Sequence, residues 1–440
     1  MILNRFFTVL LSVSCALSLM AQEQADTLTL TLDQCVEIAL SDNPTIKVAD
    51  MEIERVDYSK KETIGMLLPT IAFDGTYSRT LEKQVMYMGD QEFAIGTDNS
   101  YSTGFTASLP LIYPQLWKSL KLSDVQIYQM VESARDSKIT LVNSVENAYY
   151  ALLLAKDAYH VIQENMDNAL FNAKIYEGKY KVGTASEYDV LRSSVQVKNI
   201  EPELLKAEIA VKQATLQLKI LMGMGVTVPV NIKGSLAEYE DMMFEYTLAA
   251  DRSIENNSDL RQLDLQTDYL QAALDIQRME WYPTLALGAS YNWNAMSNGS
   301  MFSTLNWTPS SSVALSLSFT LFNGGQRYNK VKQSQIMVNE MSYQREYLVN
   351  SLNMQVELQI DNMEQMVKQI SSSSDGVAQA DKAYQIMQKS FEIGAAAYLD
   401  LRDSELALTA AQLSYYQAIY DYMVAKSNLK LLVGGDSTIN

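Results

Sequence analysis

Residues 283–293 read Pro-Thr-Leu-Ala-Leu-Gly-Ala-Ser-Tyr-Asn-Trp, and their side chains alternate in type. One set of alternate positions contains the apolar residues Leu285, Leu287, Tyr291 and Trp293. The other set carries small or polar residues. Successive side chains of a β-strand point to opposite faces. The stretch therefore predicts a strand with one apolar face and one small, polar face.

Three further segments repeat this alternation. The four predicted strands are residues 70–80, 101–112, 284–294 and 312–322, and the polar segments between paired strands, 81–100 and 294–311, are expected to be loops. Each strand has about the ~9–11 residues needed to cross a bilayer, with lipid on the apolar face and water on the other. A soluble sandwich with one wetted face shows the same alternation.

The chain also contains an internal duplication. Tyr282-Pro283-Thr284-Leu285 echoes Leu68-Pro69-Thr70-Ile71, and two later stretches, 181–185 and 218–223, recur in the same order at 392–396 and 429–434. Such self-similarity indicates a repeated structural unit. We expect a first repeat over 23–224, a linker over 225–250, a second repeat over 251–434, and a tail over 435–440.

Each repeat is predicted to contain a long helical hairpin, over residues 114–222 and 326–434. The first arm of each hairpin has almost no glycine or proline, and its apolar residues recur at spacings of three, four and seven, which is typical of a coiled-coil seam. About 65 helical residues make a rod of roughly 100 Å. The run 371–376 is read as a weak part of the helix, and Pro202 is expected to bend or interrupt the second arm of the first hairpin.

The first 22 residues predict a secretory signal peptide, with Arg5 before an apolar stretch and Ala21 near the cleavage point. In the alternative, a lipoprotein signal, Cys15 would be acylated. If the secretory signal peptide is removed, Cys15 leaves with it, and Cys35 is the single cysteine of the mature chain, expected to be buried and unpaired. No later run reaches the ~20 apolar residues of a membrane helix, so a membrane location would have to come from strands.

Composition excludes several classes of function. The chain has 34 basic and 52 acidic residues, for a net charge of −18, which excludes a general nucleic-acid binder. Two cysteines and one histidine cannot build a disulfide framework, a zinc cluster or a histidine-based triad. These counts narrow the possible catalytic chemistry. We expect no catalytic residue, no metal and no cofactor, and a protein that is not an enzyme. In the enzyme alternative Asp400 and Asp403 would serve as an acid and a base, but no pocket-forming sequence surrounds them.

Four strands cannot close a membrane barrel, because the smallest barrels have ~8 strands. An open edge in lipid would leave backbone amides unpaired at several kcal/mol each. The chain is therefore expected to share a barrel with copies of itself, and three copies would supply twelve strands. The predicted fold class is therefore mixed: a membrane β-barrel shared between copies, plus long α-helical coiled-coil rods.

These features together resemble the TolC family of outer membrane efflux proteins, over nearly all of residues 30–434. The resemblance implies a homotrimer in the outer membrane of a Gram-negative bacterium, with a 12-stranded barrel in the lipid and a 12-helix tunnel across the periplasm. It also implies a periplasmic adaptor and an inner-membrane transporter, proton-driven or of the ABC type, as partners. The duct would serve efflux or type I secretion.

The resemblance gives the two helical turns a role as the periplasmic tip that meets the adaptor. Glycine suits a tight return between antiparallel helices because it tolerates positive φ. A helix cap with no further role would explain the same glycines. The residues expected to contact the adaptor are Val182, Gly183, Thr184, Ile393, Gly394 and Ala395.

The resemblance also implies a periplasmic gate. Asp400 and Asp403 match in spacing the paired aspartates that ring the tunnel entrance in the family, and Asp189 is their counterpart in the first repeat. Three copies would place six carboxylates at one constriction, which would favour cations. A solvated acidic helix face would carry the same residues. Phe391 and Ala396 stand where some members place a tyrosine and an arginine in gate-locking bonds, and these side chains cannot form those bonds.

The alternative from another class is a periplasmic structural coiled-coil scaffold without channel activity. It would share the signal peptide, the long helices and the trimer, but its strands would not lie in lipid. The outward faces of the four strands therefore distinguish the two interpretations.

Overall fold

The computed structural model describes residues 28–435, apart from 242, 244–245, 247–250 and 301–304. The chain divides into two compact units. We call Asp50–Ser133 together with Arg261–Tyr347 the sheet unit, and the described parts of the remaining chain the hairpin unit. The expected signal peptide and the alternative acylation site Cys15 lie outside the described residues.

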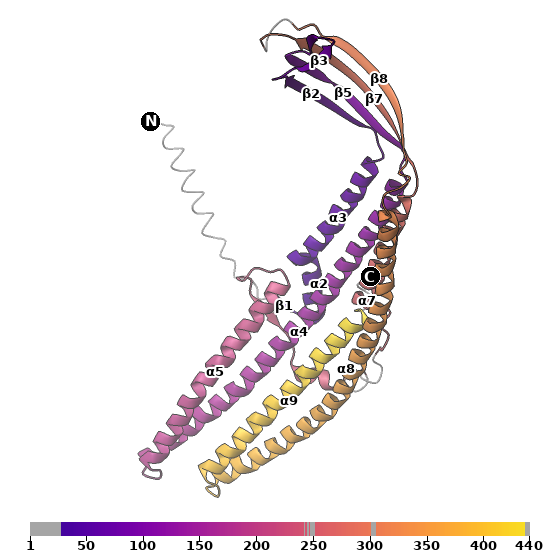
Figure 1. Ribbon diagram of the computed structural model, residues 1–440. Helices are drawn as coiled ribbons and strands as arrows, with labels where there is room; N and C mark the ends of the chain where they lie inside the picture. Colours follow the sequence, from indigo (N-terminus) through magenta and orange to yellow (C-terminus); the bar gives the residue numbers. More distant parts are fainter. Residues whose placement is uncertain (1–27, 242, 244–245, 247–250, 301–304, 436–440) are drawn as a thin grey trace, which may run out of the picture. The chain divides into compact units, whose positions relative to one another are not determined.

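The sheet unit contains a four-stranded antiparallel sheet in the order β2, β5, β7, β8 (Figure 1). These strands are Thr70–Arg79, Asn99–Ile112, Thr284–Ser297 and Thr308–Ser318, respectively. Strands β2 and β8 form its two edges. The segment after β2, which was expected to be a loop, instead contains a hairpin of β3 (Gln84–Met88) and β4 (Gln91–Ile95).

The predicted alternation of side chains is confirmed by the register of the strands. Leu317 lies opposite Leu285 and Leu315 opposite Leu287, so apolar residues of neighbouring strands share one face. Apolar side chains on the edge strands are largely exposed, at 72% for Ile71. Between the polar positions, hydroxyl groups pair across strands, as in the 2.9 Å contact of Ser290 Oγ with Ser312 Oγ.

The last strand differs from the predicted range 312–322, because β8 begins at Thr308 and ends at Ser318. Its partner β7 begins directly after Pro283, and Thr284 lies opposite Ser318. Residues beyond Ser318 therefore have no antiparallel partner. At the other end β7 extends to Ser297, which provides partners for the earlier residues of β8.

Helical segments complete the sheet unit. They belong to α3 (Pro44–Gly65), α4 (Pro114–Lys181), α7 (Ser258–Met279) and α8 (Gln326–Glu392). Ion pairs join neighbouring helices, with 2.6 Å between Lys60 Nζ and Asp124 Oδ1 and 2.6 Å between Arg345 Nε and Asp264 Oδ1. These pairs are at least partly exposed, so solvent screens them and they contribute little to stability.

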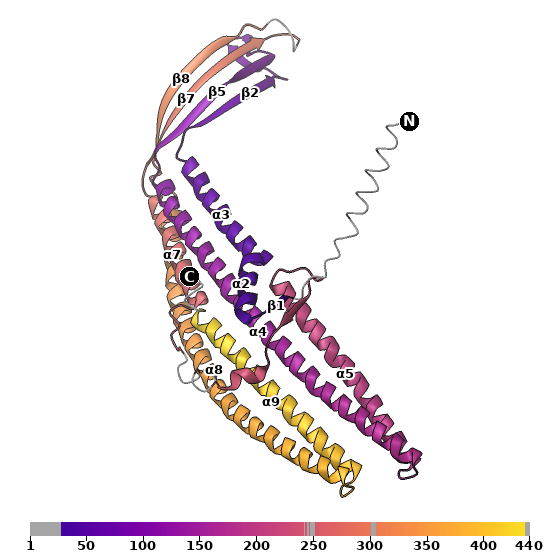
Figure 2. The ribbon, with the colours of Figure 1, turned by 180° about the vertical axis from the view of Figure 1, so that it is seen from behind.

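The hairpin unit consists mainly of two helical hairpins, α4 with α5 (Glu187–Leu221) and α8 with α9 (Tyr398–Val433) (Figure 2). The predicted seams supply much of its core. Buried residues of these seams include Val145, Tyr149 and Leu152 of α4, and Leu352, Val356, Ile360 and Met363 of α8. Burial of such side chains contributes roughly 1.5–3 kcal/mol each.

Helix α8 continues without a break through 371–376, as predicted. The expectation for Pro202 was wrong in one respect, because α5 is not interrupted there. Proline removes a single hydrogen bond to the carbonyl four residues before it. Pro202 is exposed, so water can satisfy that carbonyl while the remaining bonds of this 35-residue helix hold it together.

Short elements flank the hairpins in the hairpin unit. Strand β1 (Leu28–Leu30) pairs in parallel with β6 (Val230–Ile232), α2 (Leu32–Asp42) follows β1, and a short 3-10 helix, η1, spans Leu236–Tyr239. The described part of the linker is thus of mixed structure. Cys35 on α2 is buried and has no disulfide partner, as predicted, and burial raises the pKa of its thiol to about 11.

The duplication is visible where each repeat closes on itself. Asn43 Nδ2 donates to the carbonyl of Leu221 at 2.7 Å, and Asn257 Nδ2 donates to the carbonyl of Leu432 at 2.8 Å. Each asparagine precedes the helix that leads to its repeat's strands. In each repeat, the same type of hydrogen bond therefore joins the end of the second hairpin helix to the start of the helix that leads to the strands.

A glycine in positive φ completes this junction in the second repeat. Gly434 has φ of +101°, and a Cβ there would lie 2.0 Å from the carbonyl oxygen of Asn256. Arg135 reinforces the contact, since its guanidinium donates to the carbonyls of both Gly434 and Asn256.

No helix among the described residues is long and apolar enough to cross a bilayer.

Gly434→Ala is therefore expected to destabilise the protein. The positive φ alone costs about 1–2 kcal/mol for an alanine, and the clash with Asn256 adds to it. Gly376→Ala is the matched control, because Gly376 lies inside α8 with open space around it, and alanine there should stabilise the helix by roughly 0.5–1 kcal/mol. The measurement is the apparent unfolding temperature by circular dichroism in detergent. Equal effects of the two substitutions would contradict this account of the junction.

Candidate functional site

The turns between the paired helices form the ends of the two hairpins. Gly183 has φ of +78° and Gly394 has φ of +81°, so both use the left-handed conformation that the sequence predicts. The N–H of Thr184 donates to the carbonyl of Lys179 at 2.8 Å, and the N–H of Ala395 donates to that of Ser390 at 2.8 Å. The turns thus satisfy the last helical carbonyls with their own backbone.

The residues before the two glycines are apolar and exposed. Val182 is 73% exposed and Ile393 is 81% exposed. A Cβ added to either glycine would meet no other atom within 4 Å, so the turns are open on their outer side. The ends of the hairpins therefore present accessible apolar side chains.

Asp189 and Asp400 hold the same position in their helices and cap them. The N–H of Ser186 donates to Asp189 Oδ2 at 3.1 Å, and the N–H of Ala397 donates to Asp400 Oδ2 at 3.3 Å. The side chain of Ser186 also donates to Asp189 and, together with that backbone bond, lowers the pKa of its carboxyl. A carboxylate in the first turn of a helix is stabilised by the helix dipole. Each aspartate therefore caps the N-terminus of its helix in addition to carrying a negative charge.

Asp400 and Asp403 are both exposed and lie three residues apart on α9, on one side of the helix. The side chain of Asp403 forms no hydrogen bond or ion pair with any other described residue, and Arg402 pairs with neither aspartate in the part of the chain that the structure describes. The local pairing with Arg402 that would explain a solvated acidic face is therefore not formed. The two carboxylates are available to a partner or to ions.

Three aromatic rings join the two hairpins close to their ends. Tyr176 of α4, Phe391 of α8 and Tyr398 of α9 lie with ring centroids 5.3–6.2 Å apart. Two cations face these rings, with Lys179 Nζ 5.3 Å from the centroid of Phe391 and Arg192 Cζ 5.8 Å from that of Tyr398. We call these three rings and two cations the aromatic cluster.

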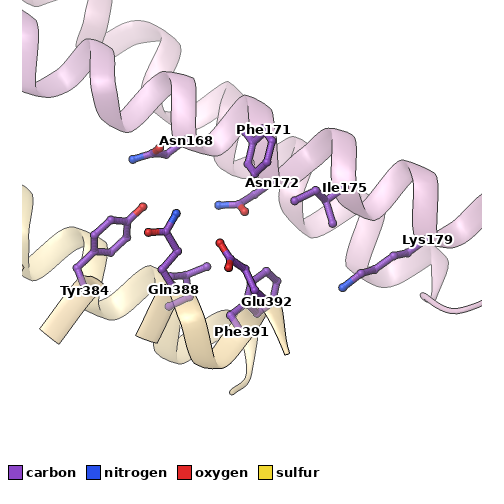
Figure 3. A pocket seen from close by; sticks show the side chains of 10 residues that line it. Asn168, Phe171, Asn172, Ile175, Lys179, Tyr384, Gln388, Phe391 and Glu392 are labelled. Atoms are coloured by element: carbon purple, nitrogen blue, oxygen red, sulfur yellow. The ribbon is translucent and has the colours of Figure 1, made fainter. Parts of the chain in front are cut away.

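A cavity of 170 Å³ lies beside the aromatic cluster, between α4 and α8 (Figure 3). Its walls include Phe171 and Ile175 of α4 and Phe391 of α8, with Asn172 and Gln388 as polar groups. Figure 3 shows side chains of the two helices facing each other across this space. A partly polar cavity thus separates the two hairpins at this point.

A second cavity, of 330 Å³, shares Asn168 and Tyr384 with the first and contains a buried carboxylate, Glu405 of α9. Glu405 is 9% exposed, and its Oε1 has no hydrogen-bond partner. Burial raises the pKa of Glu405 to about 6, against the opposing effects of a hydrogen bond from Asn168 and the charge of Arg402. Sequence reasoning missed this residue, because a glutamate on a long helix gives no local sign that another helix will cover it.

The predicted gate residues do not converge on a metal site. Among the described residues, no group of three or more His, Cys, Asp or Glu side chains is placed to hold a metal ion. The aromatic cluster also escaped sequence analysis, although its member Phe391 was noted as a departure from the family pattern. The signal that could have found it is the presence of Tyr176, Phe391 and Tyr398 within a few residues of the two glycine turns.

The chain is similar in sequence to known outer membrane proteins. The family model described as outer membrane efflux protein matches residues 35–224 and 249–435, one segment in each repeat. The chain is 22% identical over 410 residues to the probable outer membrane lipoprotein SilC of Salmonella typhimurium, covering 90% of this chain and 84% of SilC. It is 21% identical over 414 residues to the alkaline protease secretion protein AprF of Pseudomonas aeruginosa, covering 93% of this chain and 85% of AprF.

A solved structure shares the fold. The outer membrane protein VceC from Vibrio cholerae superposes with a TM-score of 0.69 at 14% sequence identity, covering 92% of this chain and 96% of that chain. The combination of long helices and strands is therefore that of the outer membrane channels, as the sequence predicted.

Replacing the buried carboxylate should change how stability depends on pH. A carboxyl whose pKa is higher in the folded than in the unfolded chain stabilises the fold at pH below its unfolded value of 4.5, and this contribution is lost as pH rises through about 6. The shift corresponds to about 2 kcal/mol. Glu405→Gln should therefore gain stability relative to the unchanged protein between about pH 5 and about pH 8.

The measurement is the apparent unfolding temperature of both proteins at the two pH values. Glu203→Gln, which removes an exposed carboxylate of α5, is the control and should show no such change. A difference between Glu405→Gln and the unchanged protein that is the same at both pH values would contradict the burial of this charge.

Proposed function

Because the chain belongs to the outer membrane efflux protein family, we propose that it is the outer membrane duct of a tripartite efflux or type I secretion system. Three copies form one channel, a periplasmic adaptor meets its tip, and an inner-membrane transporter, proton-driven or of the ABC type, supplies the energy. The duct is passive and catalyses no reaction. Relatives named for pyoverdine export and for alkaline protease secretion support an exit role.

The observation that carries this proposal is the sheet. The outer sides of its edge strands, β2 and β8, have no strand partner among the described residues, and apolar side chains on the sheet are exposed. A sheet of this kind is stable in lipid only when its edges are paired. Three copies joined edge to edge would make a closed barrel of twelve strands with its apolar face towards the lipid.

The proposed contact with the adaptor is the pair of hairpin turns. Exposed Val182 and Ile393 offer apolar side chains, and the open glycine backbones allow another helix to approach closely. The neighbouring Thr184 and Ala395 complete the contact surface. Apolar side chains at the end of a polar rod are a feature of interaction sites.

Asp400 and Asp403 are the proposed gate carboxylates, with Asp189 as their counterpart in the other hairpin. In a trimer the exposed pair on α9 would contribute six carboxylates around one axis. A narrow passage lined by one sign of charge concentrates counterions. The closed duct should therefore pass cations in preference to anions.

The test is single-channel recording in planar bilayers, comparing the unchanged protein with Asp400→Asn/Asp403→Asn. Asparagine keeps an oxygen that can accept the N–H of Ala397, so the variant removes charge but retains the helix cap. We expect small, cation-selective conductance steps that lose most of their selectivity in the variant. A folded trimer that forms no channel would favour the periplasmic scaffold, and unchanged selectivity would remove these aspartates from the gate.

The aromatic cluster is the proposed means of holding the tip closed, because Phe391 and Ala396 exclude the bonds used by some relatives. The rings of Tyr176, Phe391 and Tyr398 connect α4 of one hairpin to α8 and α9 of the other. Aromatic pairs contribute about 0.5–1.5 kcal/mol each beyond their buried area, and the facing cations add about 0.5–1 kcal/mol each. Separation of the hairpins would have to break these contacts.

Phe391→Ala should therefore loosen the tip. It removes the ring that is only 8% exposed, and we expect more frequent or larger channel openings in the same bilayer recordings. The control is Tyr188→Ala, which removes a 67% exposed ring of α5 that belongs to no aromatic pair in the described structure. If both variants open like the unchanged protein, the cluster does not hold the gate.

A further inference from the structure

The second cavity of the hairpin unit is acidic. It lies among α4, α8 and α9, and its lining includes four carboxylates and no lysine or arginine. The carboxylates are Glu164 and Asp167 of α4, Asp381 of α8 and Glu405 of α9. Four negative groups around one space of 330 Å³ repel one another and attract a positive ligand.

Glu405 differs from the other three carboxylates because it is buried. Glu164 and Asp167 are exposed and Asp381 is partly exposed, so they lie at the mouth of the cavity. Glu405 is 9% exposed, and its Oε1 has no hydrogen-bond partner. A buried acceptor without a donor is costly, and a charged one more so. The cavity therefore lacks a donor at the place where its charge is least solvated.

We propose that this cavity binds a small organic cation whose protonated primary amine donates to Glu405. The carboxylates at the mouth attract the cation, and the amide of Asn165, which is also buried, offers a further acceptor. Val161 and Leu408 on the wall suit an alkyl chain. An ammonium group, with three donors and no acceptor, is complementary to the carboxylates of this lining.

A directly coordinated metal ion fits this cavity less well. Metal ions need several ligands converging at about 2–2.6 Å. Among the described residues, no three acidic, histidine or cysteine side chains are placed to do so. An ammonium ion on a flexible chain needs only one close carboxylate and tolerates a wide cavity.

Binding should depend on pH through Glu405. The groups that face it are Arg402 and Tyr398 of its own helix, Asn168 of α4 and Tyr384 of α8. Asp381, Asp167 and Glu164 lie further out in the same cavity. Arg402 favours the ionised carboxylate, but burial outweighs it, so the pKa of Glu405 is raised to about 6. Protonation of Glu405 removes the charge that the ammonium needs. Affinity should therefore fall as pH is lowered through that value.

The inference goes beyond the proposed duct function and does not depend on it. Ligand binding can be measured on the purified full chain whether or not it conducts ions. Loss of binding with normal conductance would overturn the cation site alone, and loss of conductance with normal binding would overturn the duct alone.

The experiment is isothermal titration of the full-length protein in detergent at low salt with n-butylammonium chloride. The uncharged n-butanol is the ligand control, and Glu203→Gln, with the same loss of charge on an exposed part of α5, is the protein control. We expect n-butylammonium to bind the unchanged protein and Glu203→Gln alike, at least tenfold more weakly to Glu405→Gln, and more weakly to Asp381→Asn. We expect no binding of n-butanol.

Several results would overturn the proposal. They are no binding of n-butylammonium, equal binding to Glu405→Gln, equal binding of n-butanol, or an affinity that does not fall at low pH. Magnesium chloride titrated in parallel gives a further outcome, because tighter binding of Mg²⁺ at the same residues would assign an inorganic cation site instead. Asp381→Asn tests the cavity even where Glu405→Gln alters the fold, since Asp381 is partly exposed.

Discussion

The unpaired edges of the four-stranded sheet are the constraint on which the rest of this protein depends. Strands β2 and β8 each have one side without a strand partner in the described part of the chain, and residues such as Ile71 and Val313 expose apolar side chains on this sheet. In lipid, unsatisfied backbone groups cost several kcal/mol each. The proposal that several copies share one barrel therefore rests on backbone hydrogen bonding rather than on any particular side chain.

The hairpin unit meets a different constraint, because long helices must keep one arrangement over many turns. Apolar seams provide affinity between helices but fix their ends poorly, since a seam can slide by a turn. The two repeats solve this with one device: Asn43 and Asn257 each donate to a carbonyl at the end of a hairpin helix. A glycine beside each bond, Gly223 or Gly434, lets the two backbones approach closely. The duplicated unit therefore includes this asparagine hydrogen bond as well as the helices.

Near the ends of the hairpins, carboxylates that lie close together in the sequence differ in how deeply they are buried. Asp400 and Asp403 are exposed and keep their hydration, so they suit a passage for ions. Glu405, a few residues further along α9, is covered by other helices, and its charge is destabilised by burial. Between the hairpins the contacts are aromatic, with Phe391 among them. The aromatic contacts proposed to hold the tip and the carboxylates proposed for the gate are therefore different residues.

Local patterns in the sequence are sufficient to predict strand alternation, the two long hairpins, the duplication, and the glycine turns at Gly183 and Gly394. Each follows from the conformational preferences of neighbouring residues. Which faces meet depends instead on contacts between distant segments. The end of β8 at Ser318 depends on where β7 begins, the ring contact of Tyr176 with Phe391 joins residues far apart in the chain, and the burial of Glu405 depends on the helices that cover it. No local pattern encodes these contacts, because their energies arise only when distant segments exclude water together.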